Sequence, residues 1–193
     1  ESGMTHLYVS IPPKYISNGI GELINLLKDK NIREEIKSEM INPTTEFENY
    51  YICANGFDGI FIADCPTFKD PVGMTIGDYS RKLNIDPFDA FFDILIKNHG
   101  VCTAIYFTMG EDDIFNIIKN ENTVIGTDGI VKSLDGKCHP RAYGTFPRAI
   151  DYFHKKNKLF TLEEIIFKMT GLPANRYNIK NKGAIKNDYD ADL

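Results

Sequence analysis

Features of several common protein classes are missing from this 193-residue sequence. No apolar run approaches the roughly 20 residues that a membrane-spanning helix needs, so no membrane partner is expected. The first six residues lack the basic and hydrophobic blocks of a signal peptide. No two cysteines form a Cys-x-x-Cys pair, which excludes the usual zinc-finger spacing. These absences predict a cytoplasmic protein.

An excess of basic charge is also missing. The 22 Lys and Arg residues are outnumbered by 27 Asp and Glu, which gives a formal charge of -5. Surfaces that bind nucleic acid need clustered positive charge, so no nucleic-acid partner is expected.

The sequence contains few cysteines for its length. The four positions are widely spread: Cys53, Cys65, Cys102 and Cys138. In a chain of this length, such spacing favours reduced cytosolic thiols over a disulfide framework.

What is present is the composition of an ordinary globular protein, with 42% hydrophobic and 25% charged residues. Apolar residues at helical spacing predict two amphipathic helices, over residues 19–27 and 31–40. Residues 50–65 instead have two short β-rich runs around Asn55-Gly56, which predict a hairpin or two edge strands. Residues 1–74 are therefore interpreted as a separate small α+β segment.

Helices and strands alternate after Gly73. Asp86 followed by Pro87 is typical of a helix start, and the apolar helix it opens should end at Gly100. Residues 101–107 are nearly all apolar and predict a strand buried on both faces. A helix over 112–119 and a strand over 123–127 should follow, and this order indicates parallel βα units. Two parallel strands cannot close a sheet alone, so the chain is interpreted as part of a larger barrel.

The expected strand at 123–127 ends at an acid, Asp128, which stands before Gly129. Barrel and open-sheet enzymes place catalytic groups at this end of a strand. The alternative is an Asp-Gly turn between two strands, and the short segment alone favours that turn.

The loop that follows Asp128 concentrates polar residues before the next expected helix, from about residue 146 to 155. His139 could shuttle a proton or bind a metal, and Arg141 could bind a carboxylate through its forked guanidinium. Arg148, at the start of the next helix, could support His139 or Arg141. Each also has a plainer interpretation, because loop histidines are often solvated and arginines often pair with surface acids.

Three segments of the C-terminal half stand out, in this order: Asn122-Thr-Val-Ile-Gly-Thr-Asp-Gly129, His139-Pro-Arg-Ala-Tyr-Gly-Thr-Phe-Pro-Arg148 and Lys168-Met-Thr-Gly-Leu-Pro-Ala174. Together they resemble the N-acyl-D-amino-acid deacylases, or D-aminoacylases, of the amidohydrolase superfamily. Further segments that match this family are Asp86-Pro-Phe-Asp-Ala90 and Phe107-Thr-Met-Gly-Glu-Asp-Asp113, and the similarity runs from Pro12 to the last residues.

The resemblance implies an α/β fold, namely part of a distorted (β/α)8 amidohydrolase barrel with an inserted α+β segment. The strands at 101–107 and 123–127 would be the last two strands of that barrel. Residues 1–74 would be an insertion near the active-site mouth, 75–182 the C-terminal part of the barrel, and 183–193 the start of the return to a β-sandwich.

The resemblance also implies roles for particular residues. Asp128 matches the aspartate that carries a proton from a zinc-bound water to the leaving nitrogen, and Arg141 matches the arginine that binds the substrate's α-carboxylate. His139 would position this loop. His6 would line the side-chain pocket, while Gly129 and Arg148 would give structural support. None of these residues is expected to bind a metal.

The family's metal-binding histidines on the first, fifth and sixth barrel strands have no counterpart here. The resemblance therefore implies zinc in the full-length enzyme but none in this fragment, which we expect to be inactive by itself. A cyclic amidase of the hydantoinase or dihydroorotase type and a stand-alone binding domain are the alternatives. The expected partner is a small N-acyl-D-amino acid. The open edges of a partial barrel also predict self-association.

Overall fold

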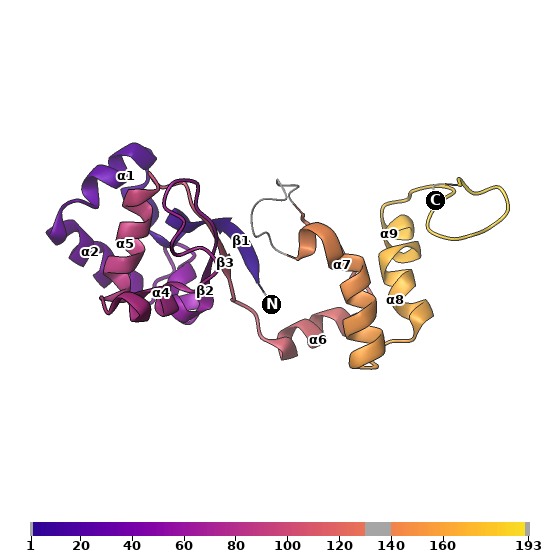
Figure 1. Cartoon of the computed structure of the whole chain (residues 1–193). Coiled ribbons are helices and arrows are strands. Elements are labelled where there is room, and N and C mark those ends of the chain that lie inside the picture. Colours follow the sequence, from indigo (N-terminus) through magenta and orange to yellow (C-terminus); the bar gives the residue numbers. More distant parts are fainter. Residues whose placement is uncertain (1, 130–139, 192–193) are drawn as a thin grey trace. The chain divides into compact units, whose positions relative to one another are not determined.

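The computed structural model describes residues 2–129 and 140–191. It divides into two compact units, the first within residues 1–110 and the second formed by the helical residues that follow. Figure 1 labels the strands and most of the helices. Among the described helices, none is both long enough and apolar enough to cross a membrane.

The sheet of the first unit contains β1 (Gly3–His6), β2 (Ile60–Asp64) and β3 (Thr103–Tyr106) in the order β1-β3-β2. β3 pairs with both neighbours antiparallel. The predicted parallel pairing is therefore wrong for these described strands. The strand predicted at 101–107 is present over four residues, and three of them, Ala104, Ile105 and Tyr106, are buried. Local sequence could not reveal the direction of pairing, because it depends on segments about a hundred residues apart.

Helices of the first unit largely follow the predicted spacing and caps. The Asp86 carboxylate accepts hydrogen bonds from the backbone N–H groups of Phe88 and Asp89 at the start of α5. The predicted strand around residues 51–54 is wrong, because residues 51–53 lie in α3 and Ala54 is its C-cap. The Asn49 side chain caps the start of this helix by accepting from the N–H of Ile52. This cap outweighs the β preference of the aromatic residues that follow it. The helices are α1 (Ile20–Leu26), α2 (Lys30–Ile41), α3 (Tyr50–Cys53), α4 (Ile76–Leu83) and α5 (Pro87–Lys97), with 3-10 turns at Leu7–Ser10, Pro13–Tyr15 and Phe57–Gly59.

Aromatic rings of α5 fill the core of this unit. Phe91 and Phe92 are fully buried, and the rings of Phe57 and Phe88 meet edge to face at 4.8 Å between centroids. Burial of each such side chain stabilises the fold by about 1.5–3 kcal/mol. The first unit therefore has a substantial hydrophobic core of its own.

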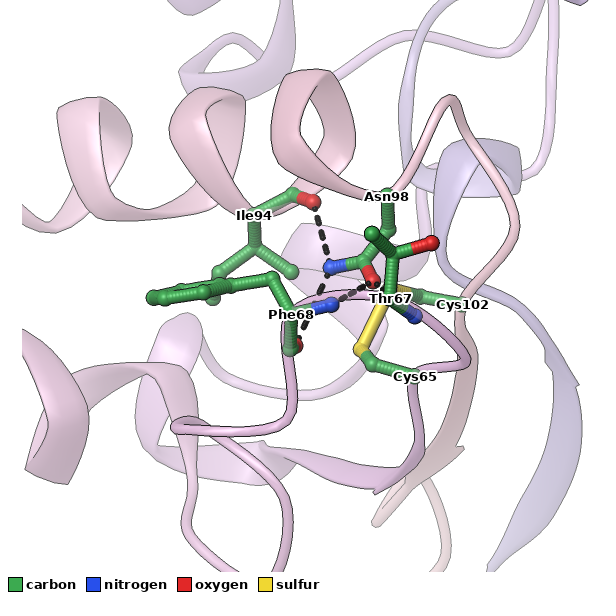
Figure 2. Close-up of a disulfide and its surroundings, with 6 residues drawn as sticks. All are labelled: Cys65, Thr67, Phe68, Ile94, Asn98 and Cys102. Atoms are coloured by element: carbon green, nitrogen blue, oxygen red, sulfur yellow. Dashed lines mark hydrogen bonds between the residues drawn. A yellow bond between two sulfur atoms is a disulfide. The ribbon is translucent and has the colours of Figure 1, made fainter.

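A disulfide joins Cys65, just after β2, to Cys102, just before β3 (Figure 2). Both residues are buried, and their Cα atoms are 4.6 Å apart. The prediction of reduced thiols is therefore wrong for this pair, whereas Cys53 is a free and exposed cysteine. Antiparallel pairing of Asp64 with Thr103 places the end of one strand beside the start of the other. Cys138 lies outside the described residues.

The buried Asn98 fixes the chain beside this disulfide (Figure 2). Its side-chain oxygen accepts hydrogen bonds from the N–H groups of Thr67 at 3.1 Å and Phe68 at 2.7 Å. Its amide nitrogen donates to the carbonyl of Ile94 at 3.0 Å. The turn after β2 is thus attached to the end of α5 as well as to β3.

Helices make up the second unit. The helix Leu162–Met169 begins after Thr161, whose hydroxyl forms a complete capping box with the Glu164 side chain. The strand predicted at 123–127 is wrong, since these residues belong to none of the described strands and Ile125 N–H donates to the Lys168 carbonyl at 3.2 Å. The elements are α6 (Glu111–Lys119), α7 (Arg141–Ala149), a π-helical segment at Ile150–Lys156, α8 (Leu162–Met169) and α9 (Gly171–Arg176).

Candidate active-site residues

Asp128 and Arg141 lie together in the second unit. Arg141 is the first residue of α7, and its Nη2 atom is 3.2 Å from Oδ2 of Asp128. The Asp128 side chain is 87% exposed, whereas that of Arg141 is only 20% exposed. The guanidinium is therefore held against the protein while the carboxylate faces solvent.

Backbone geometry presents the acid. Asp128 adopts a left-handed conformation with φ of 43°, which aspartate tolerates better than most residues. A Cβ added to Gly129 would lie 3.2 Å from the Cα of Ala142 and 3.3 Å from the carbonyl oxygen of Arg141. The chain after Asp128 thus packs closely against the first turn of α7. The absence of a side chain at Gly129 favours this approach.

The remaining predicted site residues lie elsewhere. Arg148 is exposed on α7, with its guanidinium 5.6 Å from the ring centroid of Tyr152. His6 ends β1 in the first unit, where its exposed ring stacks on Tyr8 at 5.1 Å between centroids. His139 lies outside the described residues. The structure therefore brings Asp128, Gly129 and Arg141 together.

Lys168 is a buried residue that sequence reasoning assigned no role. Its side chain on α8 is 6% exposed, and Nζ donates to the carbonyl oxygens of Asn120 at 2.7 Å and Thr123 at 3.1 Å. Burial lowers the pKa of this lysine, and the negative charge of Glu164 opposes part of that shift. The sequence contained a signal, because Lys168 is three residues after the buried Ile165 and therefore on the same face of the helix.

A metal site does not arise from the described residues alone. Within residues 2–129 and 140–191, no group of three or more His, Cys, Asp or Glu side chains could hold a metal ion. The donor set in these ranges does not fit a zinc site of the usual three or four protein ligands.

Known protein sequences similar to this chain are deacylases. No family model matches it. It is 42% identical over 129 residues to a D-aminoacylase of Alcaligenes xylosoxydans xylosoxydans, covering 67% of this chain and 25% of that protein. It is 38% identical over 126 residues to an N-acyl-D-aspartate deacylase of the same organism, covering 65% and 24%.

Solved structures similar to this chain include members of the same group of deacylases. An N-acyl-D-glutamate deacylase of Bordetella bronchiseptica, complexed with zinc and a phosphonate inhibitor, matches with a TM-score of 0.59 and 27% identity. That match covers 72% of this chain and 28% of the other. A D-aminoacylase described as defining a novel subset of amidohydrolases matches with a TM-score of 0.56 and 30% identity, covering 69% and 27%.

These matches confirm the resemblance and a mixed α/β structure related to the metal-dependent amidohydrolases. More particularly, over about two thirds of its length the chain is homologous to D-aminoacylases and N-acyl-D-amino-acid deacylases, which are hydrolases. The chain spans about a quarter of the length of the relatives that it matches by sequence.

Proposed function

We propose that the complete protein to which this chain belongs hydrolyses the amide bond of N-acyl-D-amino acids. The ion pair between Asp128 and Arg141, 3.2 Å apart, is the observation that carries this proposal. In an N-acyl amino acid, the carboxylate and the amide nitrogen are attached to the same α carbon. A residue that binds the carboxylate and a residue that protonates the nitrogen must therefore be neighbours, as these two are.

Arg141 binds the substrate's α-carboxylate in this proposal. A guanidinium offers several N–H donors in a planar fork, which suits a carboxylate. Its low exposure of 20% strengthens an ionic hydrogen bond, because less water competes for the charge. Fixing the carboxylate also fixes which enantiomer presents its amide for hydrolysis.

Asp128 carries the proton to the leaving nitrogen. Without substrate, its carboxylate occupies a position beside Arg141 that a substrate carboxylate would compete for. Its exposed side chain can rotate away when the substrate binds, and the acid then lies next to the amide nitrogen. A single positioned acid of this kind contributes about 10²- to 10⁴-fold to a rate.

The metal in this proposal is zinc, held by residues outside this chain. Support comes from the zinc named for the deacylase structure above. Such a metal supplies an activated water at neutral pH. Residues 1–193 should then be inactive alone. Self-association of the isolated chain is a further part of the proposal.

The finer division of the fold is part of the proposal. Residues 1–74 would be an insertion near the active-site mouth, 75–182 would be the C-terminal part of a barrel, and 183–193 would lead towards a β-sandwich. The structural matches, which cover about 70% of this chain, support a fold shared with deacylases, one of them described as an amidohydrolase. The named relatives are deacylases, which favours this activity over a cyclic amidase or a binding domain.

The carboxylate role can be tested in the complete protein with an N-acetyl-D-amino acid and the corresponding α-carboxamide. The wild type should hydrolyse N-acetyl-D-amino acids and should not hydrolyse their L enantiomers. Arg141→Lys should raise KM by about ten-fold or more, because the lysine ammonium cannot form the same two-pronged contact. The same variant should have little effect on the corresponding α-carboxamide substrate, which lacks the carboxylate. Equal losses on both substrates, or hydrolysis of neither by the wild type, would contradict the proposal.

A further inference from the structure

Lys168 is anchored to the chain segment that leads to Asp128. Lysines are rarely buried, and a buried ammonium is costly unless its donors are satisfied. Here Nζ donates to two backbone carbonyls, those of Asn120 and Thr123. It also lies 5.4 Å from the ring centroid of Phe160, within reach of a cation–π attraction. Both hydrogen bonds therefore fix the backbone between α6 and Asp128.

The backbone of Lys168 holds the same segment at a second point. Its carbonyl accepts from the N–H of Ile125 at 3.2 Å, so side chain and main chain of one residue bind residues 120–125. The hydroxyl of Thr123 adds a bond to the carbonyl of Ile117 at 2.8 Å, which ties the segment to α6. Asp128 follows Ile125 by three residues. Asp128 thus follows a short segment, residues 120–125, that is hydrogen-bonded to α8.

We propose that Lys168 is a positioning residue of the Asp128 site, holding residues 120–125 in the conformation that presents the carboxylate beside Arg141. This inference rests on the proposed deacylase function. A charge-assisted hydrogen bond is stronger than one between neutral groups, so two of them define the path of an otherwise irregular segment. The left-handed backbone of Asp128 and the close approach of Gly129 to α7 make the final position sensitive to that path.

Replacement of the ammonium should therefore impair catalysis more than binding. Lys168→Met keeps an unbranched side chain of similar length but removes all three donors. A misplacement of about 1 Å at a reacting group can cost about 100-fold, so kcat should fall by about 10- to 100-fold. KM should change by less than about three-fold, because Arg141, which binds the substrate carboxylate, belongs to α7 and not to residues 120–125.

A double-mutant cycle separates positioning from a general structural role. In the complete protein, kcat is measured for wild type, Asp128→Asn, Lys168→Met and the double variant. If Lys168 acts through Asp128, Lys168→Met should have little further effect once Asp128 is already asparagine. Independent, multiplicative losses would overturn the inference. Glu163→Gln, an exposed change on the same helix, serves as the control and should retain kcat.

Lys168→Gln provides a second test should the methionine variant fail to fold. Glutamine keeps a neutral donor, so its kcat should fall between those of wild type and Lys168→Met, with circular dichroism showing a native helix content. Wild-type kcat in a folded Gln or Met variant would overturn the role of Lys168. Unchanged kcat in Asp128→Asn would instead overturn the proposed function itself, so the two failures are distinguishable.

Discussion

Loss of the Cys65–Cys102 disulfide should destabilise the first unit by about 4 kcal/mol. The two cysteines are separated by 37 residues, so the bond closes a long loop in the unfolded chain. Closing a loop of this length removes about 13 cal/mol/K of chain entropy, which corresponds to about 4 kcal/mol at 25 °C. The bond joins buried residues beside the ends of β2 and β3, whose antiparallel pairing has a register shift between Ile62 and Asp64.

The perturbation is a Cys65→Ala/Cys102→Ala double variant of the protein. Because two compact units need not unfold together, stability is measured by hydrogen exchange in increasing urea, on peptides that cover β2 and β3. With a urea slope of about 1–3 kcal/mol/M, the unfolding midpoint of these peptides should fall by more than about 1 M. Cys53→Ala, which changes the free exposed cysteine, should leave the midpoint unchanged.

Reductant provides an internal control for the same reasoning. When the wild type is unfolded and refolded with reductant, its urea unfolding midpoint should approach that of the double variant. The midpoint of the double variant should not change with reductant. Non-reducing peptide mapping should also recover a linked pair of peptides containing residues 65 and 102. An unchanged midpoint in the double variant, or two free thiols in the native protein, would refute the account of this disulfide.

Two smaller effects follow from side chains of the first unit. Asp86→Ala removes the cap of α5 and the ion pair with Lys37, so urea unfolding should show a loss of about 1–2 kcal/mol; a change below about 0.3 kcal/mol would contradict the capping role. Hydrogen bonds from Arg81 and then from Thr75 hold the pKa of the Asp78 carboxyl below its ordinary value of 3.8. Since this pKa is lower in the folded state, the associated stability is present above about pH 4 and is lost as the pH falls through the folded pKa. In an NMR titration, Arg81→Gln should raise the pKa of Asp78; an unchanged value would contradict the assignment.

Local signals in the sequence predicted most of the helices. Asp86 followed by Pro87, and Thr161 followed by Glu164, specify helix starts through groups only a few residues apart. The sheet could not be predicted in this way. Its pairing of His6 with Thr103 joins residues that are distant in the sequence. The residues after Asn49 have a composition typical of a strand but form a helix that the Asn49 side chain caps. The disulfide depends on that same distant pairing.

The candidate site shows the same division between local and distant information. Asp128 and Arg141 could be proposed as site residues from the sequence because the surrounding segments resemble those of the N-acyl-D-amino-acid deacylases. Their ion pair depends on how the chain returns to α7, which no local pattern specifies. Lys168 could be recognised as a charge on an apolar helix face, but its target, the segment at 120–123, is visible only in three dimensions.

Turnover of the Asp128→Asn variant tests the central claim most directly. In the complete protein, asparagine keeps the size and exposed position of the side chain but cannot carry the proton. Asp151→Asn is the matched control, because Asp151 is also a partly exposed acid in an ion pair, with Lys156 at 2.8 Å. On an N-acetyl-D-amino acid, kcat should fall by about 10²- to 10⁴-fold for Asp128→Asn and stay at the wild-type value for Asp151→Asn. A kcat within two-fold of wild type for folded Asp128→Asn would contradict the claim.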